Sequence, residues 1–274
     1  MITELDVKGG DGRTLHAYDW GDGDRVVMWH HGTPNIGAPP RPLFAAAERL
    51  GVRFISYDRP GYGGSTPLPG RDIASAAADA AAVADALGVA EFAVFGHSGG
   101  GPHALACAAL LPGRVTAAAA ISGLAPFDAA GLDWFAGIGP AGTASLRAAA
   151  TGRAAKEAHA STPSDPDFPP ADWAALEGEW GWFGSVVEPA MAAGPAALVD
   201  DDLAYVGDWG FDPPVIAVPV LLVHGGGDLM VPASHSAWLA RRIAGAELRL
   251  VPDEGHISVL PVAAVAALEW LARA

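Results

Sequence analysis

The 274-residue sequence predicts an α/β fold, in which a mostly parallel sheet is covered by helices on both faces. Three observations lead to this prediction. Short runs that are apolar throughout alternate with stretches of helical spacing, which is typical of parallel strands buried on both faces. Two alternating, hairpin-like segments precede this pattern and indicate an antiparallel edge. The pattern stops after residue 126 and returns near residue 213, which indicates an inserted segment between them.

The first part of the chain contains most of the predicted strands. Apolar or alternating runs predict strands at 2–8, 14–19, 26–29, 52–57, 92–95 and 115–121. Helical spacing predicts helices at 43–50, at 72–87 and in the Ala/Leu-rich run that Pro112 and Gly113 end. The alternation of strands and helices is therefore established before the insertion begins.

Strands and helices alternate again in the second part of the chain. Strands are predicted at 218–223 and 247–251, and helices at 233–243 and 258–272. The intervening segment has no strong strand pattern and holds five of the nine tryptophans. We therefore predict two parts of one core, 1–126 and 213–274, with a helical lid at 127–212.

Composition describes a folded globular protein, because 51% of the residues are hydrophobic and 17% are charged. No apolar run reaches the length of a membrane span, so no membrane partner is expected. The N-terminal residues carry acids and lack an apolar signal region, which predicts a cytoplasmic protein. The single cysteine, Cys107, excludes an internal disulfide and is expected to be a buried structural thiol. The sequence carries no signal for an oligomeric state.

The net charge of −15 is concentrated in the predicted lid, where 14 Asp and Glu residues face three Arg and Lys residues. We interpret this acidity as a solvated surface. The alternative interpretation is that the segment repels anionic substrates. Both argue against a nucleic-acid partner, since phosphate binding needs basic stripes.

The candidate nucleophile is Ser98, in the sequence Gly96-His97-Ser98-Gly99-Gly100. This pentapeptide lies between a predicted strand and a predicted helix. A serine at such a sharp turn is held out at the top of the sheet. The amide of Gly99 is at a helix N-terminus, where N–H groups are free to face an anion.

A serine hydroxyl needs a base to take its proton, and the base needs an orienting carboxylate. His256 is the best candidate base, because it follows the last predicted strand, at the edge of the sheet where ligands bind. Asp228, after the preceding strand, is the favoured carboxylate, and Asp128 is the alternative. The order Ser98, Asp228, His256 is the order expected around a nucleophile of this kind.

An acyl-transfer intermediate also needs donors for its oxyanion. Gly99 N–H is one candidate, and Thr33 N–H, in the turn after the third predicted strand, is the second. The Thr33 hydroxyl is a further candidate donor. Pro34 has no N–H and restricts Thr33 to an extended conformation.

Four motifs in order resemble those of the α/β-hydrolase superfamily: HGTP (31–34), YDRPGYGGS (57–65), GHSGG (96–100) and GGGD with GH (225–228, 255–256). The chain is most similar to lidded serine esterases and lipases, and more distantly to proline iminopeptidases and epoxide hydrolases. The resemblance implies an eight-stranded, mostly parallel sheet with a lid after strand six. It also implies a cofactor-free reaction on a small-molecule substrate.

Related classes differ at particular residues. Haloalkane dehalogenases and epoxide hydrolases use an aspartate nucleophile, whereas this chain has Ser98. Hydroxynitrile lyases use a lysine near the triad, and the only lysines here are Lys8 and Lys156. Cofactor-free haloperoxidases share the core but usually lack a lid. Proline iminopeptidases hold the substrate amine with lid glutamates, and the lid candidates for such a role are Glu177, Glu179 and Glu188.

The leading hypothesis is a serine hydrolase that cleaves an ester or lactone of a small to medium apolar substrate. The alternatives are an aminopeptidase or amidase, and a non-catalytic small-molecule binder on the same fold. The candidate pocket residues are His97, Trp134, Trp180 and Trp182. His30 and His31 are adjacent at the end of a predicted strand, where successive side chains point to opposite faces, so no metal site is expected.

Overall fold

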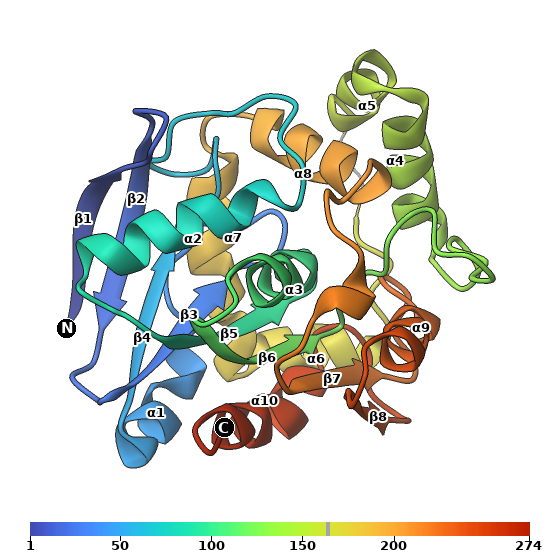
Figure 1. The fold of residues 1–274 in the computed structure, drawn as a ribbon. Helices are drawn as coiled ribbons and strands as arrows, with labels where there is room; N and C mark the ends of the chain where they lie inside the picture. The colour runs from blue at the N-terminus through green and yellow to red at the C-terminus, as the bar shows by residue number, and fades with distance from the viewer. Residues whose placement is uncertain (163–164) are drawn as a thin grey trace.

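A single sheet organises the protein in the computed structural model, which describes residues 1–162 and 165–274 (Figure 1). Within these residues the sheet has eight strands, in the order β1-β2-β4-β3-β5-β6-β7-β8. The strands are β1 (Ile2–Lys8), β2 (Thr14–Trp20), β3 (Arg25–His30), β4 (Val52–Tyr57), β5 (Phe92–His97), β6 (Val115–Ile121), β7 (Val220–Gly225) and β8 (Glu247–Val251). β1 and β2 are antiparallel to their neighbours, and the remaining pairs are parallel. The predicted mostly parallel sheet with an antiparallel edge is confirmed.

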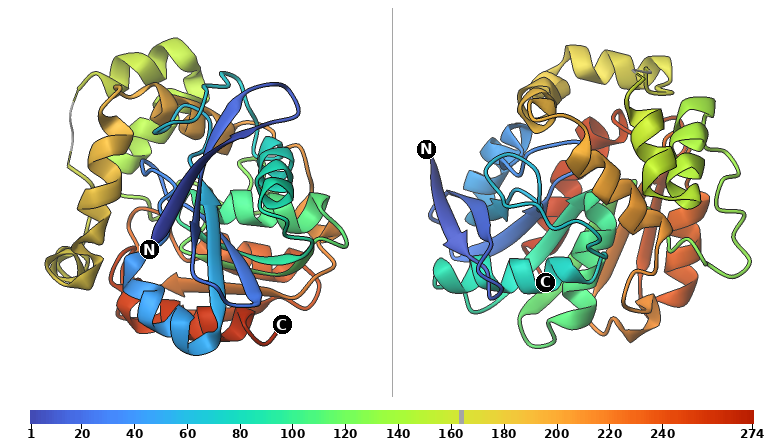
Figure 2. Two further views of the ribbon diagram at one scale, coloured as in Figure 1. Left: turned by 90° about the vertical axis from the view of Figure 1, so that its left-hand side faces the viewer. Right: turned by 90° about the horizontal axis from the view of Figure 1, so that it is seen from above.

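Helices cover both faces of the sheet (Figure 2, left). One face carries α1 (Phe44–Leu50) and α10 (Val259–Leu271), and the other carries α2 (Ser75–Ala86), α3 (Gly100–Leu110) and α9 (Ser234–Arg242). Neighbouring strand residues point to opposite faces, so Met28 and Ile55 pack with α2 and α3, whereas Val27 and Phe54 pack with α1 and α10. Both faces are therefore apolar, which explains why the strands read as continuous apolar runs.

Residues 127–212, called the insert below, connect β6 to β7. The described residues of the insert form helices and loops: α4 (Pro140–Thr151), α5 (Arg153–Ala160), α6 (Pro170–Glu177), α7 (Gly184–Met191), α8 (Ala196–Val206) and the short 3₁₀ helix η2 (Glu179–Phe183). In Figure 1, α8 lies at the top of the molecule and α4 and α5 at its upper right, and the view from above in Figure 2 shows α8 near the centre and α4 and α5 toward the side of α9.

The predicted helix at 72–87 begins only at Ser75, because Asp72 stays outside it and accepts the Ser75 N–H at 2.8 Å. A short polar side chain that bonds a nearby amide favours a helix start at this point. Cys107 is fully buried, as predicted.

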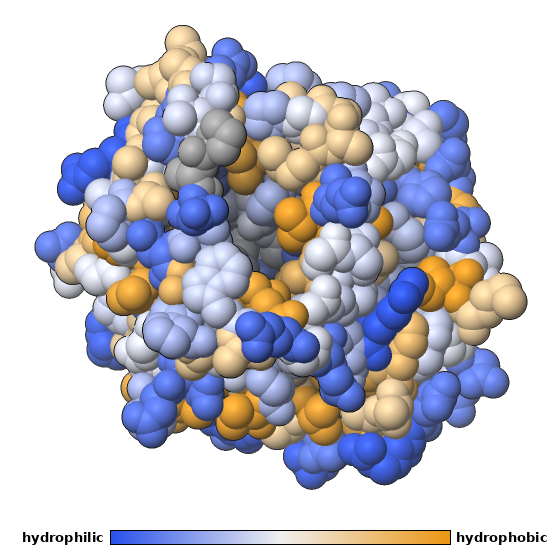
Figure 3. Space-filling view, turned by 180° about the vertical axis from the view of Figure 1, so that it is seen from behind, coloured by the Kyte–Doolittle hydropathy of each residue, from blue (hydrophilic) through white to orange (hydrophobic). Residues whose placement is uncertain are grey.

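The surface mixes polar and apolar side chains (Figure 3), and the face shown there is hollowed near its centre. In the described part of the chain, every helix is too short or too polar to cross a membrane.

Candidate active site

Ser98 lies at the sharp turn between β5 and α3. Its backbone is left-handed, with φ of 53°, a conformation that costs a non-glycine residue about 1–3 kcal/mol. Ser98 is the one partly exposed residue in the stretch 92–108, whose other residues are buried. The strained turn therefore brings one hydroxyl out of an otherwise buried strand and helix.

The two glycines that flank the turn are required by close packing. A Cβ atom on Gly96 would overlap the carbonyl of Gly100, and one on Gly100 would overlap the carbonyl of His30 on β3. The spacing of Gly96, Ser98 and Gly100 therefore follows from the close approach of α3 to the two strands beneath it.

His256 and Asp228 form a buried pair on the loops after β8 and β7. His256 Nδ1 lies 2.8 Å from Asp228 Oδ2. The other oxygen of Asp228 accepts the backbone N–H groups of Met230 and Val231, both at 2.9 Å. Asp128, the alternative carboxylate, is exposed on the loop after β6. The geometry therefore pairs the imidazole with Asp228.

This pairing changes the pKa values of both groups. Burial lowers the pKa of His256, but the charge and hydrogen bond of Asp228, helped by the charge of Asp172, outweigh burial and raise it above its ordinary value. Burial opposes ionisation of Asp228, yet His256 and His224 hold the pKa of its carboxyl far below the usual range. The carboxylate is therefore charged and stabilises a protonated imidazole.

His97 ties the His256 loop to the strand that carries Ser98. Its Nε2 donates to the backbone carbonyl of His256 at 3.1 Å, and the two rings lie 5.1 Å apart. Burial lowers the pKa of His97 to about 3, so its ring is neutral. Within the described residues, the Ser98 hydroxyl forms no hydrogen bond to His256. Such bonds often tighten only when substrate is bound.

The turn after β3 presents Thr33 N–H away from Arg59. The Arg59 guanidinium donates to the carbonyl of His31 and, at 3.1 Å, to that of Gly32. The Gly32 carbonyl and the Thr33 N–H belong to one peptide unit, so they point in opposite directions. Arg59 therefore fixes the orientation of the predicted oxyanion donor.

The Thr33 hydroxyl is not a free donor, which corrects one expectation. Its one hydrogen goes to Asp201 Oδ2 at 2.5 Å, because a carboxylate only accepts. The hydroxyl oxygen also receives Arg59 Nη2 at 2.9 Å and the Tyr205 hydroxyl at 2.6 Å. Of the two donors on Thr33, only the backbone N–H remains a candidate for the oxyanion.

Gly99, the other predicted donor, lies beside Thr33. It is the N-cap residue of α3, where amides have no partner within the helix. A Cβ atom on Gly99 would overlap the Tyr205 hydroxyl and lie 2.7 Å from Thr33 Oγ1. The two candidate oxyanion residues and the insert therefore meet at one point next to Ser98.

The predicted pocket residues lie in two separate places. Trp134 packs against Phe127, Phe135 and His235, and its indole N–H donates to Ala125. Trp180 and Trp182 pack with Phe183, whose ring lies 5.6 Å from that of His97. All three tryptophans are buried.

Two insert side chains that sequence reasoning missed lie near the candidate base, one against His256 and one against His97. The Phe168 ring stacks at 6.5 Å from the His256 ring, and Phe183 lies against His97. Neither belongs to a motif, and both occur in an insert already rich in aromatic residues, so the sequence offers no signal that separates them.

The acidity of the insert is not all solvated, which is a second correction. Asp172, Asp200, Asp201 and Asp202 are buried. Asp200 pairs with Arg153, Asp201 with Arg59 and Arg71, and Asp202 with Lys156. For Asp200, Asp201 and Asp202, the sequence signal for burial was an acidic run inside an otherwise apolar helix. Asp172 had no such signal in the sequence. By contrast, Glu177, Glu179 and Glu188 are exposed.

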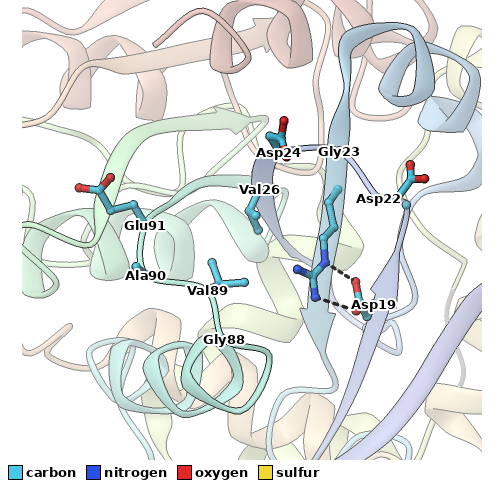
Figure 4. Close-up of a pocket in the computed structure, with 11 residues that line it drawn as sticks. Asp19, Asp22, Gly23, Asp24, Val26, Gly88, Val89, Ala90 and Glu91 are labelled. Atoms are coloured by element: carbon cyan, nitrogen blue, oxygen red, sulfur yellow. Dashed lines mark hydrogen bonds and ion pairs between the residues drawn. The ribbon is translucent and has the colours of Figure 1, made fainter.

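A surface groove lies at the other end of the parallel strands (Figure 4). Asp22, Asp24 and Glu91 line it, and Asp19 is paired there with Arg53 at 2.8 Å. The groove flanks the starts of β3 and β5, whereas Ser98 follows the end of β5. Among the described residues, no group of three or more His, Cys, Asp or Glu side chains is arranged to hold a metal ion.

The strand order and the serine on the strained turn after β5 define an α/β-hydrolase architecture. The family model described as alpha/beta hydrolase fold matches residues 25–261, so the chain belongs to this family.

Curated relatives match a shorter stretch. A non-heme haloperoxidase from Rhodococcus erythropolis is 38% identical over 96 residues, which are 35% of each chain. A bifunctional esterase/perhydrolase from Acinetobacter calcoaceticus is 39% identical over 95 residues, or 33% of this chain and 34% of the relative. These matches thus span about a third of the relatives' length. The crystal structure of a hydrolase from Pseudomonas aeruginosa covers 99% of both chains with a TM-score of 0.74 and 23% identity, which shows a shared fold.

Proposed function

We propose that the protein is a serine hydrolase that cleaves a carboxylic ester or lactone through an acyl-enzyme on Ser98. The observation that carries the proposal is the buried His256–Asp228 pair, which His97 ties to the strand that ends in Ser98 on its strained turn. His256 takes the Ser98 proton as the oxygen attacks the carbonyl carbon, and the charge of Asp228 stabilises the imidazolium.

In the proposed reaction, the N–H groups of Thr33 and Gly99 stabilise the oxyanion. His256 then gives its proton to the leaving alcohol, and water attacks the acyl-enzyme with His256 again as the base. The Phe168 ring lies against His256 and the Phe183 ring against the neighbouring His97, and these apolar surroundings support a small to medium apolar acyl group.

The test is hydrolysis of p-nitrophenyl acetate and butyrate by Ser98→Ala. The proposal predicts a loss of about 10³-fold or more in kcat/KM, because a general-base-activated nucleophile is removed. Undiminished turnover by a variant with the wild-type melting temperature would reject it.

A second candidate, perhydrolysis, is favoured by the stretch shared with the esterase/perhydrolase. Hydrogen peroxide would replace water as the attacker of the acyl-enzyme, giving a peracid and free Ser98. Peracid formation from acetate ester and peroxide, lost in Ser98→Ala, tests this activity. The aminopeptidase alternative stays a prediction; its three candidate glutamates are exposed on the insert.

A further inference from the structure

Asp172, in α6 of the insert, is buried against the backbone that carries the candidate base. Its Oδ2 accepts His256 N–H at 2.9 Å, across 84 residues of sequence. Its Oδ1 accepts Ile257 N–H at 2.9 Å and Ser258 N–H at 2.8 Å. The side chain is fully buried, so these three bonds replace water around its carboxylate.

These three amides lead directly into α10. The first N–H groups of a helix have no partner within the helix, and they carry the positive end of its dipole. α10 has no side-chain cap of its own and no acidic residue in its first turn. A carboxylate from the insert therefore does what a local cap normally does.

The backbone of His256 is consequently held at both its N–H and its carbonyl group. Asp172 binds its N–H, and His97, next to Ser98, donates to its carbonyl at 3.1 Å. Asp228 holds the ring at Nδ1. Three segments far apart in the sequence thus converge on one residue, and the insert supplies one of them.

From this arrangement we propose that Asp172 is a positioning residue for His256, through which the seating of the insert sets the geometry of the catalytic base. The inference rests on the proposed serine-hydrolase function. Asp172 does not touch the reacting atoms; it orients the loop from which the imidazole projects.

The charge of Asp172 adds to this effect. The charged groups that raise the pKa of His256 are Asp228 and Asp172, against the effect of burial. The other groups against the ring are neutral His97 and the Phe168 ring. An uncharged residue at position 172 therefore makes the imidazolium less stable.

The test compares Asp172→Asn with wild type on p-nitrophenyl butyrate. Loss of the carboxylate should lower kcat about 10- to 100-fold, because small misplacements of catalytic groups have effects of this size. KM should change less than about threefold, since ground-state contacts to the substrate are kept. The acid limb of the kcat/KM profile should move to lower pH, because His256 is then easier to deprotonate.

Asp167→Asn is the matched control. Asp167 is also an insert carboxylate that accepts helix N-terminal amides, those of Ala141 and Gly142 at 2.8 and 3.1 Å, but it caps α4. It should also destabilise the fold, through the loss of a helix cap, and keep kcat within about twofold. Asp172→Glu keeps the charge with one extra methylene, so it should restore the acid limb and only part of kcat.

A measurement without substrate separates this inference from the proposed function. The proton between His256 Nδ1 and Asp228 is expected to give a far-downfield ¹H resonance, to be identified by its loss in Asp228→Ala. In Asp172→Asn it should shift or broaden, whatever the substrate is. Wild-type kcat, acid limb and downfield resonance in folded Asp172→Asn would overturn the proposal; if that variant does not fold, wild-type kcat in Asp172→Glu would do so.

Discussion

Two aspartates of the insert reach the core on opposite sides of β5, and they are stabilised in different ways. Asp201 holds the turn after β3 and pairs with two buried arginines, Arg59 at 2.7 Å and Arg71 at 2.5 Å. Asp172 holds the loop after β8 through three neutral amides. Both carboxylates are fully buried.

The difference has a physical consequence. Burial alone would raise the pKa of Asp201, but Arg59 and Arg71 hold it well below its ordinary value. Removing Asp201 leaves two like charges buried together, on Arg59 and Arg71. Removing Asp172 leaves only three neutral backbone amides without their acceptor. We therefore expect Asp201 to act chiefly on stability, beside the candidate oxyanion residue Thr33, and Asp172 chiefly on activity, beside the candidate base His256.

The largest expected effect is on stability. Asp201→Ala should lower the free energy of unfolding by about 3–5 kcal/mol, because it breaks a buried ion network. Asp172→Ala should lower it by about 1–3 kcal/mol, the effect of buried groups left unpaired. Urea denaturation followed by circular dichroism measures both. Equal losses would remove the distinction between the two sides.

A smaller effect is expected on the rate at the oxyanion side. Gly99→Ala drives a methyl group into the Tyr205 hydroxyl, so it should move the Gly99 amide and reduce kcat by about 10²–10³-fold.

Tyr205→Phe is the partner variant, since it removes the hydroxyl that the new methyl group would meet. The double variant should recover part of the activity, which a double-mutant cycle measures. Strict additivity of the two changes would show that the clash with Tyr205 is not the cause.

The smallest effect concerns pH. In the proposed reaction neutral His256 is the active form, and its pKa is raised, so kcat/KM of the wild type should fall as the pH drops through a value above about 6.5. Asp201 is not among the groups that raise this pKa. Asp201→Asn should therefore leave the acid limb in place, while Asp172→Asn moves it to lower pH. A shift of equal size in both variants would contradict the assignment of the two sides.

The strands and the loops that carry the candidate triad could be predicted from the sequence. Strands β1, β4, β6 and β8 have the predicted bounds, because each is a short apolar or alternating run between clear breakers. The motifs also placed Ser98, Asp228 and His256 on loops at one edge of the sheet, because parallel strands end together.

The burial of aspartates in the insert could not be predicted from the sequence, for a physical reason. An aspartate in an acidic, alanine-rich segment looks solvated unless its partners are known. The partners of Asp172 lie 84 to 86 residues away and are backbone amides, which leave no trace in the sequence. Arg59 lies 142 residues from Asp201, and the YDRPGYGGS motif that contains it gives no sign of this partner. Only the packing of the insert on the core brings them together.

The most direct test of the account is covalent labelling of the intact protein with a fluorophosphonate, followed by peptide mass spectrometry. Wild type should carry one adduct, on Ser98, and His256→Ala should label far more slowly because the hydroxyl then lacks its base. Absence of an adduct on Ser98, or an equal labelling rate in the two proteins, would contradict the claim that His256 activates this serine.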